Sequence, residues 1–237
     1  HEEKILIFAV GCVGLFLTSF FWWRDIVAES EGGKFHNKVV QIGLRYGMIL
    51  FIASEIMFFS AWFWAFFDVA FYPGENSQEL IGRQEALGGV FPPEDIELIP
   101  PFGIPLLNTF ILLASGGTVT WAHHALREND RKNFLIFLFL TILLGLIFTG
   151  FQGYEYVHAT FSIDEGIYPS TFYMATGFHG AHVIIGTIFL IVCFIRGAKG
   201  HFKPEKHLGF EFAAWYWHFV DVVWLFLFTF VYWWASF

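Results

Sequence analysis

Six long apolar runs dominate the pattern of hydrophobic and polar positions along the chain. Each is long enough for a helix that crosses a bilayer, which takes about 20 residues. All eight prolines lie in the connections or in first helical turns, which suits helices that satisfy their own backbone groups in lipid. The pattern predicts an all-α, polytopic membrane helix bundle, with residues 1–237 as a single transmembrane helical domain. The expected spans are 5–24, 44–71, 104–127, 133–158, 170–196 and 210–236.

The last apolar run, EFAAWYWHFVDVVWLFLFTFVYWW, is unusual because it carries three ionisable side chains. At roughly 100° per residue, Glu211, His218 and Asp221 fall within an arc of about 80° on a helix. Ionisable groups at membrane depth are costly, so they face protein or water rather than lipid. This polar stripe predicts that the last helix packs inside an assembly.

Composition and charge agree with a membrane protein. The chain is 56% hydrophobic and 14% charged, with 33 Phe and 10 Trp, which excludes an ordinary soluble domain. We expect no nucleic-acid partner. By the positive-inside rule, the connections rich in Lys and Arg face the cytoplasm or matrix, so both ends of the chain lie on the periplasmic or intermembrane side. Eleven of the 13 basic residues lie in these connections: Arg24, Lys34, Lys38, Arg45, Arg127, Arg131, Lys132, Arg196, Lys199, Lys203 and Lys206.

Glu55 stands near the middle of the apolar run LFIASEIMFFSAWFWAFF. Burial disfavours a charged carboxylate, so an unpaired acid at this depth would carry a proton. One interpretation is a carboxyl group that handles protons or is linked to lipid. The other is a neutral acid that is hydrogen-bonded to a neighbouring helix. Acids inside the membrane are functional candidates by default, which favours the first interpretation.

His179 and His182 lie on one helical face in Phe-His-Gly-Ala-His, beside small residues that permit close helix approach. With His218 they raise the alternative of haem or copper ligation, since imidazole suits both. The chain has no Cys-x-x-Cys-His motif. We therefore interpret these residues as hydrogen-bonded core histidines and expect no metal. Gln152 and Glu155 share a stripe at the outer end of span 133–158, which we interpret as a polar seam.

Arginines lie where three of the spans meet the basic side of the membrane: Arg45, Arg127 and Arg196. Arg binds phosphate through paired hydrogen bonds, and basic pockets between helices hold anionic lipid head groups. Side chains that reach out to the membrane surface as anchors explain the same positions equally well. Both interpretations stay open at this point.

Four long motifs together resemble the cytochrome c oxidase subunit III family, in order and over essentially the whole chain. They are LRYGMILFIASEIMFF, LLNTFILLASGGTVTWAHHAL, FYMATGFHGAHVIIGTIFLIVCFIRG and GFEFAAWYWHFVDVVWLFLF. The family has seven transmembrane helices, and this chain aligns from the second helix onward. We therefore expect six helices here, with the first supplied by a separate fragment as one alternative.

The resemblance implies a role without redox chemistry in this chain. Haem and copper belong to the partner subunits I and II, where electrons from cytochrome c reduce oxygen to water while protons are pumped. The family's subunit III packs on subunit I, holds phospholipids, supports proton uptake and protects the complex from inactivation during turnover. The family's carbodiimide-reactive carboxyl group matches Glu55. Its contacts to anionic lipid phosphate map onto Trp23, His36, Arg45 and Arg196.

Three alternatives differ in function. A quinol oxidase subunit III would share the fold and the oxygen chemistry but would serve a membrane-soluble electron donor. A stand-alone proton carrier would need a continuous polar path, and Glu55 has no obvious charged companions at its depth. A membrane b-type cytochrome would need paired histidines on facing helices. The resemblance favours the cytochrome c branch, in a bacterial cytoplasmic membrane or a mitochondrial inner membrane.

Overall fold

A computed structural model describes residues 2–33, 35–74, 89–94 and 96–237. Six helices in these residues are long and apolar enough to cross a membrane, and no strand forms in this part of the chain. The prediction of an all-α polytopic membrane bundle with six spans is confirmed. The long helices are α1 (Glu2–Gly32), α2 (Lys38–Phe71), α4 (Ile104–Arg127), α5 (Arg131–Val157), α6 (Ile167–Ala198) and α7 (Leu208–Phe226).

The chain divides into two compact units, His1–Ile49 and Leu50–Phe237. In the first unit, α1 continues to Gly32, beyond the predicted end of the span at residue 24. The added segment, DIVAESEG, is polar but contains good helix formers, so the helix continues after the apolar run ends. That the whole chain forms a single domain stays a prediction.

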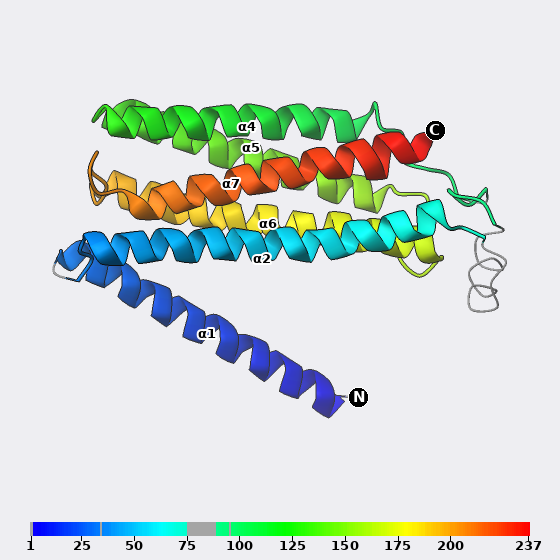
Figure 1. The fold of residues 1–237 in the computed structure, drawn as a ribbon, viewed down its shortest axis with the longest axis horizontal. Helices are drawn as coiled ribbons and strands as arrows, with labels where there is room; N and C mark the ends of the chain where they lie inside the picture. The colour runs from blue at the N-terminus through cyan, green and yellow to red at the C-terminus, as the bar shows by residue number, and fades with distance from the viewer. Residues whose placement is uncertain (1, 34, 75–88, 95) are drawn as a thin grey trace. The chain divides into compact units, whose positions relative to one another are not determined.

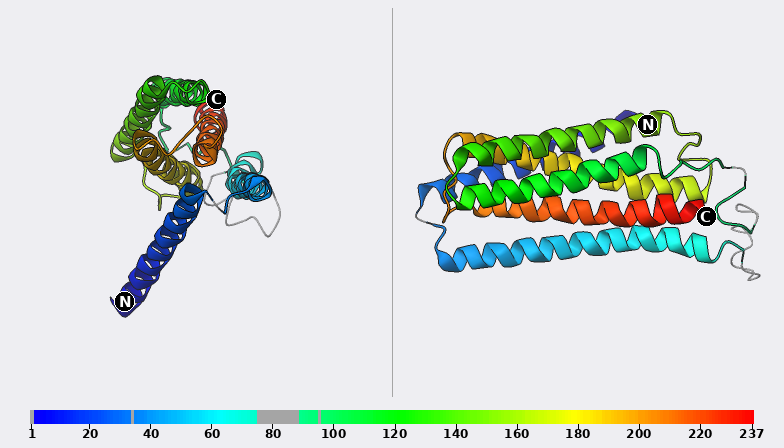
Figure 2. Two further views of the ribbon diagram at one scale, coloured as in Figure 1. Left: turned by 90° about the vertical axis from the view of Figure 1, so that its left-hand side faces the viewer. Right: turned by 90° about the horizontal axis from the view of Figure 1, so that it is seen from above.

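The second unit is built around α4, α5, α6 and α7, which are coloured green to red in Figure 1. Each of these helices contacts the next, and α7 returns to contact α4. The end-on view in Figure 2 shows the resulting ring of four helices. Short connections join consecutive helices, as is typical of antiparallel neighbours in a bundle.

Trp217 occupies the centre of this ring and is fully buried. Its indole Nε1 donates a hydrogen bond to Ser115 Oγ on α4, at 2.9 Å. A Cβ added at Gly145 on α5 would lie 2.7 Å from the Trp217 ring, and one at Gly186 on α6 would lie 3.0 Å from it. The two glycines therefore form the space that the indole fills, and one side chain of α7 contacts three other helices.

Further hydrogen bonds join the helices inside the bundle. Trp224 Nε1 donates to Thr109 Oγ1 at 2.9 Å, and the hydroxyls of Thr118 and Thr141 lie 2.8 Å apart. Lipid offers no replacement partner for such groups, so the bonds favour the packed bundle over separated helices.

The helix ends follow ordinary rules of helix capping. Pro105 lies in the first turn of α4, where its missing N–H leaves no helical hydrogen bond unmade. Asp130 caps the beginning of α5, because its side chain accepts a hydrogen bond from the Asn133 backbone at 3.1 Å. Hydrogen bonds from the Asn133 backbone and side chain lower the pKa of Asp130 below its ordinary value. After Phe226 the last helix widens into a π-helix, η2 (Leu227–Trp233), and ends in the short 3₁₀ turn η3 (Trp234–Ser236).

Candidate functional site

Glu55 on α2 and His182 on α6 form a hydrogen-bonded pair within the second unit. The distance between Glu55 Oε2 and His182 Nε2 is 2.9 Å, although the residues are 127 positions apart in the sequence. The two side chains are largely buried, with 21% of Glu55 and 13% of His182 exposed. The acid that the sequence places at membrane depth therefore has a titratable partner.

The hydrogen bonds of the His182 ring restrict how protons are placed in this pair. His182 Nδ1 donates to the Phe178 carbonyl oxygen at 2.6 Å, because a carbonyl only accepts. If the ring is neutral, Nε2 is an acceptor and Glu55 donates to it as a carboxylic acid. If the ring is protonated, Nε2 donates to the Glu55 carboxylate. Both arrangements contain the same number of protons and have no net charge, which suits a site inside a membrane.

Aromatic rings surround the Glu55–His182 pair. The ring of Phe59 lies edge-on to the His182 ring at 4.9 Å between centroids, and the ring of Phe58 lies at 6.0 Å. Tyr216 on α7 stacks against His182 at 6.3 Å. A shell of this kind limits the access of water. The geometry allows a proton to move along one short hydrogen bond without changing the net charge of the pair.

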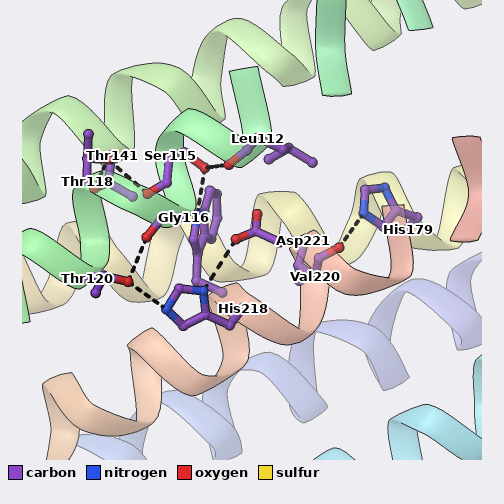
Figure 3. Close-up of polar contacts among 11 residues, drawn as sticks. Leu112, Ser115, Gly116, Thr118, Thr120, Thr141, His179, His218, Val220 and Asp221 are labelled. Atoms are coloured by element: carbon purple, nitrogen blue, oxygen red, sulfur yellow. Dashed lines mark hydrogen bonds and ion pairs between the residues drawn. The ribbon is translucent and has the colours of Figure 1, made fainter. Parts of the chain in front are cut away.

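A second polar cluster lies between α4 and α7 (Figure 3). His218 Nδ1 lies 3.5 Å from Asp221 Oδ2, and His218 Nε2 lies 3.2 Å from Thr120 Oγ1. The Thr120 hydroxyl donates to the Gly116 carbonyl at 2.9 Å, so it accepts from His218. A Cβ at Gly116 would lie 2.5 Å from Asp221 Oδ2. The glycine therefore leaves the space that the buried carboxylate occupies.

The remaining members of the predicted polar stripe have different environments. His179 is buried, and its Nε2 lies 3.1 Å from the Val220 carbonyl oxygen of α7 (Figure 3). Glu211 lies half-buried in the first turn of α7, where the helix dipole favours an acid. Among the residues that the structure describes, no three His, Cys, Asp or Glu side chains form a group that could hold a metal ion.

The predicted lipid-binding residues belong to both units. Trp23 is exposed on α1, while His36 and Arg45 are half-exposed near the beginning of α2. Arg196 lies in the last turn of α6 in the second unit, with its guanidinium carbon 4.6 Å from the centre of the Phe202 ring. A Cβ at Gly209 would lie 2.9 Å from an Arg196 nitrogen, so the glycine allows the guanidinium to approach the beginning of α7.

Two further polar contacts depend on partners that the sequence did not indicate. Tyr232 donates to Glu155 Oε1 at 2.6 Å, and Gln152 donates to the same oxygen at 3.1 Å. His123 Nε2 and His207 Nε2 lie 3.2 Å apart near the ends of α4 and α7. Gln152 and Glu155 are visible in the sequence as a polar seam. Nothing in the sequence pairs that seam with Tyr232, or His123 with His207.

Comparison with known proteins gives a consistent result over the whole chain. A family model described as "Cytochrome c oxidase subunit III" matches residues 1–236. The chain is 55% identical over 230 residues to "Cytochrome c oxidase subunit 3" of Arabidopsis thaliana, covering 97% of this chain and 83% of the relative. It is 54% identical over 236 residues to the protein of the same name in Equus caballus, covering 100% of this chain and 87% of the relative. For Marchantia polymorpha the identity is 55% over 228 residues, covering 95% of this chain and 82% of the relative. The chain therefore belongs to the cytochrome c oxidase subunit III family, whose members are subunits of a multi-subunit, haem–copper oxidoreductase complex of the membrane.

Proposed function

We propose that this chain is a core subunit, without a redox centre of its own, of a proton-pumping cytochrome c oxidase. Electrons from cytochrome c enter through other subunits, and oxygen is reduced to water at the haem and copper of subunits I and II. The Glu55–His182 pair carries this proposal. It presents a proton-sharing carboxyl group in an aromatic shell, where the family has its carbodiimide-reactive acid. Such a pair supports proton uptake and needs no metal.

Affinity purification through a tag on this chain tests the assignment. We expect a preparation that contains haem and copper, includes subunits I and II, and oxidises reduced cytochrome c. A preparation that oxidises quinol but not cytochrome c would place the chain in a quinol oxidase instead. A preparation without haem would contradict the assignment altogether.

We further propose that the chain binds structural phospholipids and thereby protects the complex during turnover. Arg196 supports this role, because its guanidinium lies at the membrane-surface end of α6, over the Phe202 ring. Arginine at this level is suited to the phosphate of an anionic lipid. Trp23, His36 and Arg45 are proposed as lipid contacts in the first unit.

Replacing Arg196 with glutamine is expected to weaken lipid binding, since the variant keeps the aliphatic stem but loses the charge. Loss of one charge-assisted hydrogen bond, about 1.5 kcal/mol, corresponds to roughly tenfold lower retention of anionic lipid. Lipid bound to the purified complex would be measured by mass spectrometry, together with the working lifetime of the oxidase. Lys199→Ala is the matched control, because Lys199 is an exposed cation that directly follows α6, three residues after Arg196. Equal lipid retention in both variants would remove Arg196 from this role.

We propose that the basic connections face the cytoplasm or matrix and that both ends of the chain lie on the opposite side. Most of the described basic residues gather around two connections: Arg127, Arg131 and Lys132 flank 128–130, and Arg196, Lys199, Lys203 and Lys206 lie in or just before 199–207. Lys34 and Arg83 lie outside the described residues. Cysteines introduced at Lys203 and Ser162, both exposed, would report the orientation through a thiol reagent that does not cross membranes. We expect labelling of the first only from the inner side and of the second only from the outer side. The reverse pattern would invert the topology.

A further inference from the structure

The layer of the bundle that contains Trp217 has a counterpart seven residues away on each helix. The Trp217 layer consists of Ser115 on α4, Gly145 on α5, Gly186 on α6 and Trp217 on α7. Seven residues complete nearly two turns, so a side chain seven positions away returns to the same side of its helix. Counted toward the end of the bundle where the chain terminates (Figure 1), this step gives a second layer, here called the Asn108 layer: Asn108, Gln152, His179 and Trp224.

Contacts of Trp224 connect three helices at the Asn108 layer. The centroids of the Trp224 and His179 rings lie 5.2 Å apart, which joins α7 to α6. The Trp224 indole N–H donates to Thr109, which follows Asn108 on α4. The two tryptophans therefore occupy equivalent places in successive layers of the ring of helices.

Gln152 brings α5 to the same layer through Tyr232. Its Nε2 donates to Tyr232 Oη at 3.5 Å. The Tyr232 ring in turn lies 5.8 Å from the Trp224 ring between centroids. All four helices of the ring thus contribute a side chain to the Asn108 layer.

The polar members of the Asn108 layer keep hydrogen-bonding atoms that the described part of the chain does not satisfy. Asn108 is 0% exposed, His179 1% and Gln152 5%. Within the described residues, Asn108 Oδ1 and Nδ2, Gln152 Oε1 and His179 Nδ1 have no hydrogen-bond partner. Buried polar groups without partners are costly, and folded proteins rarely gather several of them in one place. In the neighbouring layer, by contrast, Trp217 and Ser115 satisfy each other at 2.9 Å.

One oxygen of Glu155 extends this set of atoms toward the end of α5. Glu155 Oε1 accepts hydrogen bonds from Tyr232 and from Gln152. Glu155 Oε2 is also buried, and no group in residues 2–33, 35–74, 89–94 and 96–237 bonds it. The unsatisfied atoms therefore continue from the Asn108 layer for almost one further turn of the helix.

The chemistry of these atoms selects the kind of molecule that fits between them. Gln152 Oε1 and Asn108 Oδ1 can only accept hydrogen bonds, whereas Asn108 Nδ2 can only donate. His179 Nδ1 is an acceptor in the neutral ring, because Nε2 donates to the Val220 carbonyl oxygen. A metal cation cannot bind the amide N–H, and an anion cannot bind the amide oxygens. Water both donates and accepts, and a buried water makes about three hydrogen bonds to such groups.

We propose that the Asn108 layer is a binding site for ordered water molecules, which bridge α4, α5 and α6 and extend to Glu155. The site lies inside the ring of four helices and involves neither Glu55 nor His182. It joins Glu155 to His179 through water rather than through direct contact. This inference goes beyond the proposed function and does not depend on it.

An experimental density map of the purified complex, at a resolution that shows ordered water, tests the site directly. We expect water within hydrogen-bonding distance, about 2.7–3.2 Å, of Asn108 and of either Gln152 Oε1 or His179 Nδ1. If these side chains instead bond one another directly and the map shows no water among them, the proposal is wrong.

Radiolytic labelling provides a second measurement with an internal control. X-ray irradiation splits bound water into hydroxyl radicals, which oxidise the side chains beside it even inside a protein. Trp224 and Trp217 are equally inaccessible, at 1% and 0% exposed, but only Trp224 belongs to the layer with unsatisfied atoms. In the intact complex we expect Trp224 to be oxidised several-fold faster than Trp217. Equal protection of the two tryptophans would contradict the proposal.

Combining Asn108→Leu with Gln152→Met removes three of the unsatisfied atoms and roughly preserves the side-chain volumes. We expect the excess oxidation of Trp224 to be lost, so that its rate falls to that of Trp217. Thr149→Val on α5 is the matched control, because the Thr149 hydroxyl already donates to the Gly145 carbonyl oxygen of its own helix. This control should leave the labelling of Trp224 unchanged. Persistent excess labelling in the double variant would show that Asn108 and Gln152 do not hold the water.

Discussion

Replacing Gly145 with leucine is expected to destabilise the bundle by about 3 kcal/mol or more, because the new side chain has no space. Its Cβ alone would lie 2.7 Å from the Trp217 ring and 2.9 Å from Thr187 Oγ1. Trp217 cannot move aside easily, since its indole N–H bonds Ser115 and its ring also fills the space beside Gly186. The amount of folded subunit in membranes and its resistance to thermal unfolding in detergent would measure the loss.

Gly150→Leu on the same helix is the matched control for this prediction. No atom lies within 4 Å of a Cβ at Gly150, and the position is exposed. The control should change stability by no more than about 0.5 kcal/mol, as is usual for surface substitutions. If both variants lost stability equally, a general effect of a large side chain on α5, and not the space for Trp217, would explain the result.

Replacing Glu55 with glutamine is expected to abolish carbodiimide labelling of this chain while leaving most electron transfer intact. A carbodiimide takes up the proton and the carboxylate of an acid to form an O-acylurea, and an amide cannot react in this way. Glutamine has the same shape as glutamate and can still donate a hydrogen bond to His182 Nε2, so the local structure should persist. Peptide mass spectrometry would locate the adduct, and oxygen consumption would measure electron transfer.

Asp221→Asn is the matched control for labelling, because Asp221 is the buried acid of the other polar cluster. This variant should keep the carbodiimide adduct at Glu55. Unchanged labelling of the Glu55→Gln chain would show that another carboxyl group reacts. Loss of electron transfer in Glu55→Gln would contradict a supporting role for the pair.

The helices of this chain could be predicted from its sequence because each crosses the membrane as one apolar run. The predicted span 104–127 coincides with α4, and 170–196 falls within α6. The residues at which the helices begin and end were less predictable than the spans themselves. Hydrophobicity indicates where lipid contact stops, whereas the helix hydrogen bonds continue into polar residues, as they do from Asp25 to Gly32.

The partners of the polar residues could not be predicted in the same way. Glu55 is conspicuous in the sequence, but its contact with His182 depends on how α2 packs against α6. That Glu211, His218 and Asp221 share one arc follows from the geometry of a single helix, so the sequence alone predicts it. Whether each of these side chains is buried depends on neighbours such as Gly116 and Thr120, which come from a distant part of the chain.

The π-helix at Leu227–Trp233 determines which side chain reaches the acid on α5. Hydrogen bonds from each residue to the fifth one before it fit an additional residue into the turn, and they rotate everything that follows around the helix axis. Tyr232 lies within this widened turn, with its hydroxyl on Glu155. If the same residues continued as a regular α-helix, the phenol would point in another direction and the carboxyl group would lose its shortest contact. One additional residue in this turn therefore determines which side chains near the end of the chain face the interior of the bundle.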